Sequence, residues 1–258
     1  MTNSKIQSYT PRTHSRIKNN SETPFVLLVL TKSNESENIR NEFPVRVLRY
    51  LAKRAMATDD STCKDIIKSR NLPLPEEPIL FLKPSTSLIQ EGQNIIIPKT
   101  FNKVAHEVEL ACVIAKRCKN VSKASAMQFV GGYCLALDMT AQCHLQIARS
   151  KGMPWALGKG FDTSTPVSRL FTPDEVSDPH KLKLWLKVNG NIRQRGNTAD
   201  MIFKIPDIIE YASKHMTLEP FDVILTGTPG GADPVAPGDI IECGMGDLVE
   251  MKFNVVAE

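Results

Sequence analysis

Short apolar or alternating runs, bounded by Pro, Gly and Asn, recur from residue 77 to residue 256 and limit what this chain can fold into. Runs of about four to eight residues rich in Val, Ile and Leu are typical of β-strands, whereas helices need longer stretches with a period of about 3.6 residues. We therefore expect strands in EPILFL (77–82), NIIIP (94–98), HEVELACVIAK (106–116), YCLALD (133–138), KLKLWLKVNG (181–190), FDVILTG (221–227), GDIIEC (238–243) and DLVEMKFNVV (247–256).

Helical signals are few. The stretch MTAQCHLQIARSKG (139–152) reads as a helix, and Pro206 opens a shorter one, because proline is favoured in the first turn of a helix. The dipeptide Asn189-Gly190 predicts a hairpin turn. Since strands outnumber helices and do not alternate with them regularly, a doubly wound parallel sheet is excluded. The prediction is an α+β fold that is mainly β.

The positive charge of the chain is concentrated at its N-terminal end. Residues 1–60 contain ten Lys and Arg against six Asp and Glu, and the other 198 residues contain 22 of each kind. An electrically balanced body argues against nucleic acid as a partner, since nucleic-acid-binding proteins gather Lys and Arg on a folded face.

Membrane and disulfide classes are also disfavoured. No apolar run approaches the ~20 residues of a membrane-spanning helix, so we expect no membrane partner. The six cysteines form no Cys-x-x-Cys pair, and several lie within apolar runs. We interpret them as buried, reduced thiols rather than as a disulfide framework or a zinc site.

The domain organisation is predicted to be an extension over residues 1–62 followed by a folded domain over residues 63–258. Residues 1–42 are rich in Ser, Thr and Asn with little periodicity, which favours disorder. Residues 43–58 combine an apolar helical face with basic side chains and no acidic residue, a pattern typical of organelle-targeting segments. An untargeted surface helix, or a sequence wrongly joined upstream of the true start, would give the same pattern.

Three carboxylates form the first candidate site. Glu107 and Glu109 stand two residues apart on an expected strand, so both side chains project from one face, and Asp138 ends the strand YCLALD. Like charges beside apolar neighbours repel each other and need a counter-charge. Carboxylates without cysteine suit a hard cation such as Mg²⁺ or Mn²⁺. A solvated strand face, with Asp138 capping the next helix, fits the same spacing equally well.

A lysine and a turn form the second candidate. Lys159 lies between two glycines in GMPWALGKGFD (152–162), where the backbone can approach a ligand and the lysine can meet a carboxylate or a developing enolate. The glycine spacing is not that of a phosphate-binding loop. The segment TGTP (226–229) follows a strand and offers hydroxyl and N–H groups, although alone it predicts only a turn.

Several ordered motifs together resemble the fumarylacetoacetate hydrolase family. They are FLKPSTS (81–87), HEVEL (106–110), LALDMTA (135–141), GMPWALGKGFD (152–162), KLKLWLKVNGNIRQ (181–194) and LTGTP (225–229). The resemblance covers about residues 76–256 and is greatest to the short mitochondrial members, the acylpyruvases that also act on oxaloacetate as decarboxylases. It implies a β-roll like that of the family's C-terminal domain, a homodimer and a mitochondrial location, with the cytoplasm as the alternative.

The resemblance also implies roles for individual residues. It makes Glu107, Glu109 and Asp138 ligands of Mg²⁺ or Mn²⁺, turns Lys159 toward the substrate, and places Thr228 near the substrate's carboxylate. In the family's chemistry a 2-oxo acid chelates the metal through its carboxylate and 2-oxo oxygens. Metal and lysine then stabilise the enolate that forms by proton loss, C–C cleavage or decarboxylation.

Some positions depart from the family's pattern. Ile66 and Ser69 stand where related acylpyruvases carry the His and Glu of a lid-helix dyad that activates water, and neither is a general base near neutral pH. Gln142 stands where the family has arginine, and Leu145 where it has glutamine. We retain Gln142 as a substrate-binding candidate. His144 should point away from the site.

Two functions follow. The first is a Mg²⁺-dependent enzyme for short 2-oxo acids, which hydrolyses acylpyruvates or decarboxylates or tautomerises oxaloacetate. Hydrolysis is the reaction most threatened by Ile66 and Ser69, whereas enolate chemistry needs only the metal and the lysine. The second is a catalytically impaired relative that binds metal or 2-oxo acid. A further explanation of the missing dyad is that residues 1–75 are wrongly predicted sequence.

Overall fold

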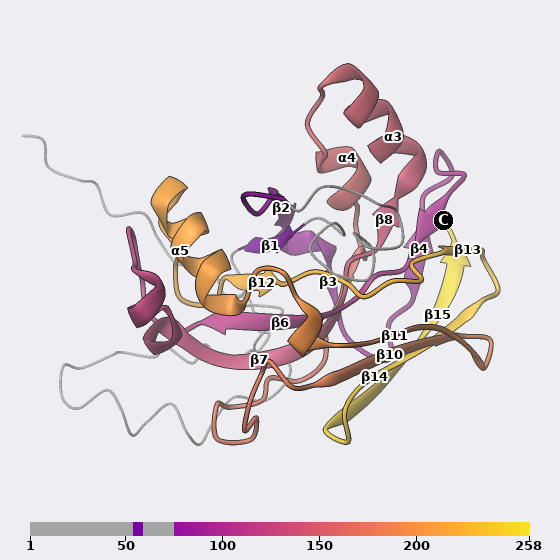
Figure 1. Ribbon diagram of the computed structural model, residues 1–258. Coiled ribbons are helices and arrows are strands. Elements are labelled where there is room, and N and C mark those ends of the chain that lie inside the picture. The colour runs from indigo at the N-terminus through magenta and orange to yellow at the C-terminus, as the bar shows by residue number, and fades with distance from the viewer. Residues whose placement is uncertain (1–53, 59–74) are drawn as a thin grey trace, which may run out of the picture. The chain divides into compact units, whose positions relative to one another are not determined.

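The structure is a computed structural model that describes residues 54–58 and 75–258 (Figure 1). All of these residues belong to one compact unit. Among them, no helix is both long and apolar enough to cross a lipid bilayer. The segment expected to be disordered (1–42) and most of the targeting candidate (43–53) lie outside the described residues.

Strands dominate the described part of the chain. They are β1 (Arg54–Thr58), β2 (Leu80–Pro84), β3 (Leu88–Ile89), β4 (Ile95–Ile97), β5 (Val104–Ala105), β6 (Val108–Ile114), β7 (Val130–Leu137), β8 (Thr140–Ala141), β9 (Thr165–Pro166), β10 (Lys183–Val188), β11 (Asn191–Asn197), β12 (Val223–Leu225), β13 (Pro234–Val235), β14 (Ile240–Met245) and β15 (Val249–Ala257). The described helices are α3 (Gln142–Lys151), α4 (Ala156–Lys159) and α5 (Ile205–His215), with 3-10 turns at Ser85–Ser87, Lys123–Phe129 and Thr198–Asp200. The predicted α+β, mainly β fold is confirmed, and every run that was expected to form a strand contains one.

The first sheet has the strand order β2-β1-β12-β6-β7 (Figure 1). β1 is parallel to β12 and antiparallel to β2, and β6 is antiparallel to both β12 and β7. The helix expected over residues 43–58 is wrong for Arg54–Thr58, since these residues form β1 in the interior of the sheet. Pairing with strands distant in the sequence outweighs the local helical pattern of so short a run. β1 also precedes residue 63, the expected start of the folded domain.

The second sheet has the order β11-β10-β14-β15-β4. Asn189 and Gly190 join β10 to β11 with φ angles of 50° and 77°, both in the left-handed region that a type I′ hairpin requires. The predicted hairpin is therefore confirmed. Along β10, Leu184, Leu186 and Val188 are buried, as their period of two predicts.

A β-bulge interrupts this hairpin at Arg193. Leu186 pairs with Gln194 and Lys187 pairs with Ile192, so Arg193 is the extra residue on β11. Because Leu186 points into the core, the residue opposite it points there as well. The bulge thus turns Gln194 inward, and its side chain is only 1% exposed.

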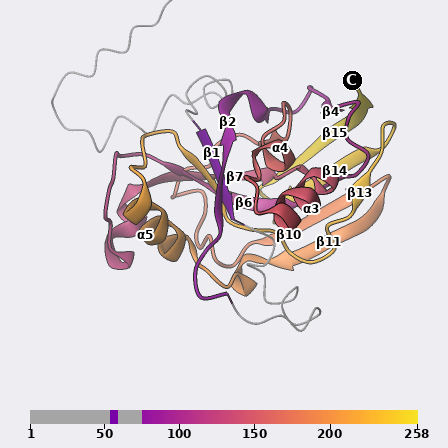
Figure 2. The ribbon, with the colours of Figure 1, turned by 90° about the horizontal axis from the view of Figure 1, so that it is seen from above.

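The helices pack at two separate places. α3 and α4 pack against each other, α4 also contacts β2 and β8, and α3 also contacts β5 and β8. α5 packs against the Lys123–Phe129 turn and lies away from α3 and α4 in both views (Figures 1 and 2). Pro206 lies in the first turn of α5, as predicted, and the Lys204 N–H donates to Asp207 Oδ2 at 2.9 Å. Two smaller sheets, β13-β5-β8 and β3-β9, complete the fold.

Strand β6 of the first sheet is buried on both faces. On β6, Leu110 and Cys112 belong to the main apolar cluster, which extends into the second sheet, whereas Ala111 and Val113 belong to a second cluster on the other face. Burial on both faces explains why this strand reads as a nearly continuous apolar run. Because side chains alternate along a strand, Glu109 lies on the same face of β6 as Ala111 and Val113. The strand therefore carries an acidic side chain into the interior on that face.

The cysteines of the described residues are free thiols. Burial raises the pKa of Cys134 to about 12 and raises those of Cys112 and Cys243 as well. These thiols therefore remain protonated and unreactive near neutral pH.

Candidate active site

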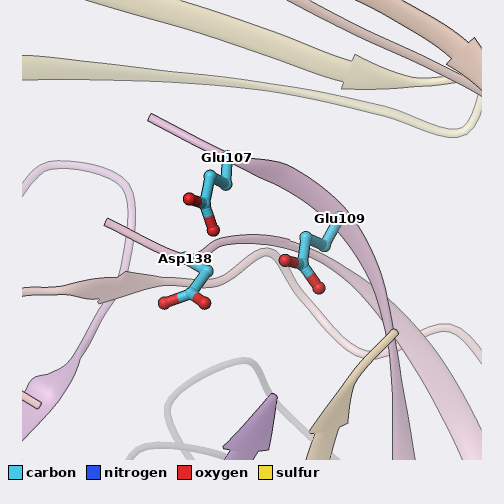
Figure 3. A group of neighbouring side chains, drawn as sticks. All are labelled: Glu107, Glu109 and Asp138. Carbon is cyan, nitrogen blue, oxygen red and sulfur yellow. The ribbon is translucent and has the colours of Figure 1, made fainter. Parts of the chain in front are cut away.

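Three carboxylates meet where β6 begins and β7 ends (Figure 3). Asp138 directly follows β7, and its N–H donates to Glu107 O at 2.8 Å, so these two residues face each other across the strand pair. Glu109, two residues farther along, projects from the same face. One oxygen atom from each carboxylate lies within 4.8 Å of the others, and all three residues are buried. The structure thus brings together the residues that the sequence suggested as a cation site.

Glu109 is the most isolated of the three carboxylates. Its Oε2 accepts a hydrogen bond from the Gly227 N–H at 2.6 Å, and its Oε1 has no hydrogen-bond partner among the described residues. Burial, followed by the charges of Asp138 and Glu107, raises the pKa of Glu109 well above its ordinary value. A buried carboxylate oxygen without a partner fits an ion as its missing ligand.

Lys159 supplies the main counter-charge. It ends α4, is 1% exposed, and its Nζ donates to Glu107 Oε2, Asp138 Oδ2 and Thr140 Oγ1, each at 2.7 Å. Burial opposes the charged form, but the charges of Asp138 and Glu107 outweigh burial and raise the pKa of Lys159 above its ordinary value. Lys159 therefore stays protonated at neutral pH and acts as a cationic hydrogen-bond donor.

Lys83 is a second buried lysine, which the sequence analysis did not single out. It lies on β2, and its Nζ donates to Asp138 Oδ1 at 2.6 Å and to the main-chain oxygen of Lys159. Burial lowers the pKa of Lys83, and Asp138 offsets part of that effect. The signal was present in the strand pattern, because Lys83 shares one face of β2 with the buried Phe81. A lysine in an inward position needs an acidic partner.

The glycines beside Lys159 are explained by packing. A Cβ atom on Gly158 would lie 3.2 Å from Leu145 N, and one on Gly160 would lie 2.9 Å from Pro84 Cδ. We expected these glycines to bring the backbone close to a ligand. They instead bring α4 close to α3 and to β2, which holds the lysine over the carboxylates.

The segment TGTP (226–229) completes one edge of β6. β12 ends before this segment, and a side chain takes over the pairing, since Thr228 Oγ1 donates to Val108 O at 2.9 Å. Gly227 lies between β12 and this contact, with its N–H directed at Glu109 Oε2. The Thr228 hydroxyl is therefore engaged within the protein, and the segment supports a carboxylate of the site.

Gln194 is bound to the same segment. Its Oε1 accepts from the Val108 N–H at 3.1 Å and lies 2.8 Å from His106 Nδ1, and its Nε2 donates to Thr228 Oγ1 and to Pro229 O, both at 2.8 Å. All four hydrogen-bonding positions of the amide are used. His106 is fully buried, and burial lowers its pKa. Gln194 belongs to one of the motifs that carry the family resemblance, but no role was predicted for it from the sequence.

The remaining predicted residues lie on α3 or outside the described residues. Gln142 is half-buried at the start of α3, four residues after Asp138. His144 packs against Phe101 with ring centroids 4.7 Å apart. That it points away from the site stays a prediction. Ile66, at one of the two dyad positions, lies outside the described residues, and so does the other dyad position, residue 69.

The charges and donor atoms define what the site can do. Three carboxylates and two lysines leave one net negative charge when all are ionised, in a place from which water is largely excluded. An all-oxygen donor set suits a hard divalent cation such as Mg²⁺ or Mn²⁺, held by Glu107, Glu109 and Asp138. Cationic donors that are fixed in a dry site stabilise negative charge as it develops on a bound oxygen.

Comparison with known proteins agrees with the motifs. The model of the family described as fumarylacetoacetate (FAA) hydrolase C-terminal matches residues 53–256. That match includes β1 and every other described strand and helix up to Val256 in β15. The segment before residue 53 is outside it.

Individual relatives are similar over most of the chain. A human protein called mitochondrial oxaloacetate tautomerase FAHD1 is 50% identical over 191 residues, which are 74% of this chain and 86% of the relative. A rice protein called mitochondrial oxaloacetate tautomerase FAHD2 is 51% identical over 186 residues, 71% of this chain and 82% of the relative. The fumarylpyruvate hydrolase of Pseudomonas aeruginosa, solved in complex with Mn²⁺ and pyruvate, matches with a TM-score of 0.73 and 27% identity over 80% of this chain and 91% of its own.

Proposed function

Because this chain belongs to the fumarylacetoacetate hydrolase family, we propose that it is a Mg²⁺- or Mn²⁺-dependent enzyme that interconverts the keto and enol forms of oxaloacetate. Acylpyruvate hydrolysis and oxaloacetate decarboxylation are the other reactions that such a site could perform on short 2-oxo acids. The relatives named above as oxaloacetate tautomerases support the first choice.

The observation that carries this proposal is the buried group of Glu107, Glu109 and Asp138 with Lys159 bonded to two of them. When bound to these oxygens, a divalent cation would polarise a 2-oxo group and favour its enolate. The unpartnered Oε1 of Glu109 fits this role. The donor set, the burial and the charge balance all agree with such an ion.

Lys159 is the proposed catalytic residue. Because its pKa is raised, its ammonium is retained and does not remove a proton. It would donate to an enolate oxygen in exchange for one of its three present acceptors, Glu107, Asp138 or Thr140. Lys83 holds the other oxygen of Asp138 and the main chain of Lys159, and so fixes both groups relative to each other. When the substrate loses a proton from the carbon beside its 2-oxo group to solvent water, a cation and an ammonium on the same face would share the negative charge that develops on the oxygen. Return of a proton to oxygen or to carbon then gives the enol or the keto form.

Thr228 and Gln142 remain the proposed substrate contacts. Gln142, half-buried at the start of α3, would donate a neutral hydrogen bond to a substrate carboxylate, a weaker contact than the arginine that the family pattern has there. Thr228 would act through its backbone, because its hydroxyl hydrogen is donated to Val108 O. Hydrolysis is expected to be the weakest activity, since Ile66 and Ser69 cannot activate water.

The test is a substrate panel with purified protein. We expect ultraviolet absorbance of the enol to show faster oxaloacetate tautomerisation with Mn²⁺ or Mg²⁺ than with a chelator. Glu109→Gln and Lys159→Met should each lower this rate by about 100-fold or more, the typical effect of removing one electrostatic contact to developing charge. Glu250→Gln, at an exposed position on β15, is the matched control and should have no effect.

Two results would redirect the assignment. Acylpyruvate cleavage faster than tautomerisation would make the protein a hydrolase, as the Pseudomonas aeruginosa structural relative is named. Mn²⁺ binding without turnover of any short 2-oxo acid would instead identify a binding protein that has lost catalysis.

We also propose a homodimer and a mitochondrial location. The mitochondrial names of the relatives support the location. Light scattering coupled to gel filtration tests the dimer. A fluorescent fusion of the full chain, compared with one that lacks residues 1–52, tests the location.

A further inference from the structure

Gln194 is the buried polar residue that the proposed chemistry leaves unexplained. It lies on β11, the edge strand of the second sheet, yet its four hydrogen bonds reach the start of β6 and the TGTP segment of the first sheet. A buried amide with every donor and acceptor used is strongly oriented, because any rotation leaves several groups unpaired. We propose that Gln194 is a positioning residue for the metal site and acts through Glu109; this inference rests on the proposed function.

The bulge is the first observation behind this assignment. Without the bulge, the register of the hairpin would place Arg193 opposite Leu186, and Gln194 would point outward. Bulges are common next to active sites, where they redirect a side chain. The hairpin gives up regular pairing at the one position that brings Gln194 to the site.

The second observation is the path from Gln194 to the carboxylate. The Gln194 amide holds Thr228 and Pro229, on the C-terminal side of Gly227, and the Gly227 N–H is the hydrogen-bond donor to Glu109 Oε2. Glu109 Oε1 has no protein partner in the described part of the chain. The backbone N–H of Gly227 is therefore the hydrogen bond that orients this carboxylate among those residues. The position of Glu109 therefore depends on where Gln194 keeps the segment.

The third observation is close packing between β11 and the same segment. A Cβ atom on Gly196 would lie 2.4 Å from Pro229 Cβ, and one on Gly231 would lie 2.1 Å from Arg193 O. Glycine at both positions lets the chain after β12 lie directly on the bulged strand. Gln194 therefore lies where β11 packs directly against the segment that follows β12.

The amide orientation also fixes one proton on His106. Pro229 O can only accept and the Val108 N–H can only donate, so Gln194 Oε1 faces His106 and the imidazole Nδ1 must be the donor. The Nδ1–H tautomer of His106 is therefore a structural signature of the intact network, and it can be observed without any metal.

The experiment compares the wild-type chain with Gln194→Glu, which keeps the size of the side chain but, even with its carboxyl protonated, can donate to only one of Thr228 and Pro229. We expect Mn²⁺ affinity, measured by calorimetry, to fall by about 10- to 100-fold, the usual effect of losing a group that orients a ligand. Oxaloacetate turnover at saturating Mn²⁺ should fall as well. The Gly227 amide should exchange with solvent faster in the metal-free variant.

The matched control is Ser213→Ala on α5. Ser213 is fully buried, and its hydroxyl accepts from the Val121 N–H and donates to Glu210 O, in a part of the fold that lies away from α3 and α4. It should lower the melting temperature and leave Mn²⁺ affinity within twofold. If Gln194→Glu behaves like this control, with lower stability and unchanged Mn²⁺ affinity, its role is structural and the proposal is wrong.

Further outcomes keep the two proposals separate. If wild-type protein neither binds Mn²⁺ nor turns over oxaloacetate, the proposed function fails, and exchange at Gly227 still decides whether Gln194 holds the segment. Exchange that is unchanged in the variant overturns the positioning role in either case. If Gln194→Glu does not fold, Thr228→Val removes one of the two Gln194 contacts to the segment, and Mn²⁺ affinity and Gly227 exchange, without turnover, are its readouts.

Discussion

Two fully buried lysines set the charge of the candidate site. Lys159 compensates Glu107 and Asp138, and Lys83 compensates the second oxygen of Asp138. An unpaired buried charge is costly, so each ammonium stabilises the fold only while its partner remains. The opposite shifts of their pKa values follow from the environment, because Lys159 has two carboxylate partners whereas Lys83 has one and the like charge of Lys159 nearby.

Replacing Lys83 by Met should show this dependence. Removing one partner of a buried ion pair typically costs about 3–5 kcal/mol, and we expect a loss of this size in the free energy of unfolding when a chelator is present. Mn²⁺ should restore part of the loss, since it replaces the missing positive charge beside Asp138. Urea unfolding of the variant with and without Mn²⁺ measures both effects.

Lys252→Met is the control for that measurement, because Lys252 forms an exposed ion pair with Glu242 at 3.9 Å. It should leave the urea midpoint nearly unchanged under both conditions. A Lys83→Met protein as stable as this control would contradict the ion-pair account.

The raised pKa of Glu109 predicts a pH dependence of metal binding. In the metal-free protein this carboxyl is protonated at pH values below its raised pKa, so a cation must displace the proton. Mn²⁺ affinity should therefore rise as the pH rises toward that pKa and should level off above it. Calorimetry in two buffers with different heats of ionisation should show proton release on binding, and Glu109→Gln should release less. Affinity independent of pH would show that Glu109 is already ionised before the metal binds.

At the level of elements, the edge of β6 beyond β12 is completed by side chains instead of by another strand. This arrangement works only because the chain after β12 lies against β11, where Gly231 has a φ angle of 99° and no room for a side chain. The element that supports Glu109 is thus defined by contacts between distant segments.

Gly231→Ala should therefore destabilise the protein more than Gly238→Ala. Both glycines have a φ angle of 99°, but nothing lies within 4 Å of a Cβ atom on Gly238. We expect a cost of about 1–2 kcal/mol at Gly238 from the backbone alone, and about 1–3 kcal/mol more at Gly231 from the clash with Arg193 O. Chemical unfolding of the two variants measures the difference. Equal losses would mean that the segment can move away from β11.

The elements that could be predicted from the sequence are those with local signals. Neighbouring residues are enough to predict the alternation along β10, the Asn189-Gly190 turn and the apolar run of β6. They are also enough to place Glu107 and Glu109 on the same face of a strand. β1 was mistaken for helix because its five residues are specified by pairing with β2 and β12. The roles of Lys83 and Gln194 were missed for a similar reason, since the hydrogen-bond partners of both side chains lie in distant segments.

For the whole molecule, the metal should act as part of the fold. The carboxylates connect β6 and β7, and the main apolar cluster links these strands to the second sheet. A ligand that binds only the folded state stabilises it by about 2.7 kcal/mol at 100 times its dissociation constant. We expect Mn²⁺ to raise the melting temperature by several degrees, and a chelator to reverse the shift. Glu109→Gln should abolish most of it, and an undiminished shift in that variant would place the ion elsewhere.

The pairing of Glu107 with Asp138 across β6 and β7 has a consequence for how activity reports on folding. A slip of one residue between these strands would send alternate side chains to the opposite face and scatter the three carboxylates. Misregistered molecules would then have no enzymatic activity at all, instead of a reduced turnover rate. The specific activity per mole of protein, at saturating metal, would measure the fraction of chains whose central strands are correctly aligned, and refolding yield could be read directly from enzyme assays.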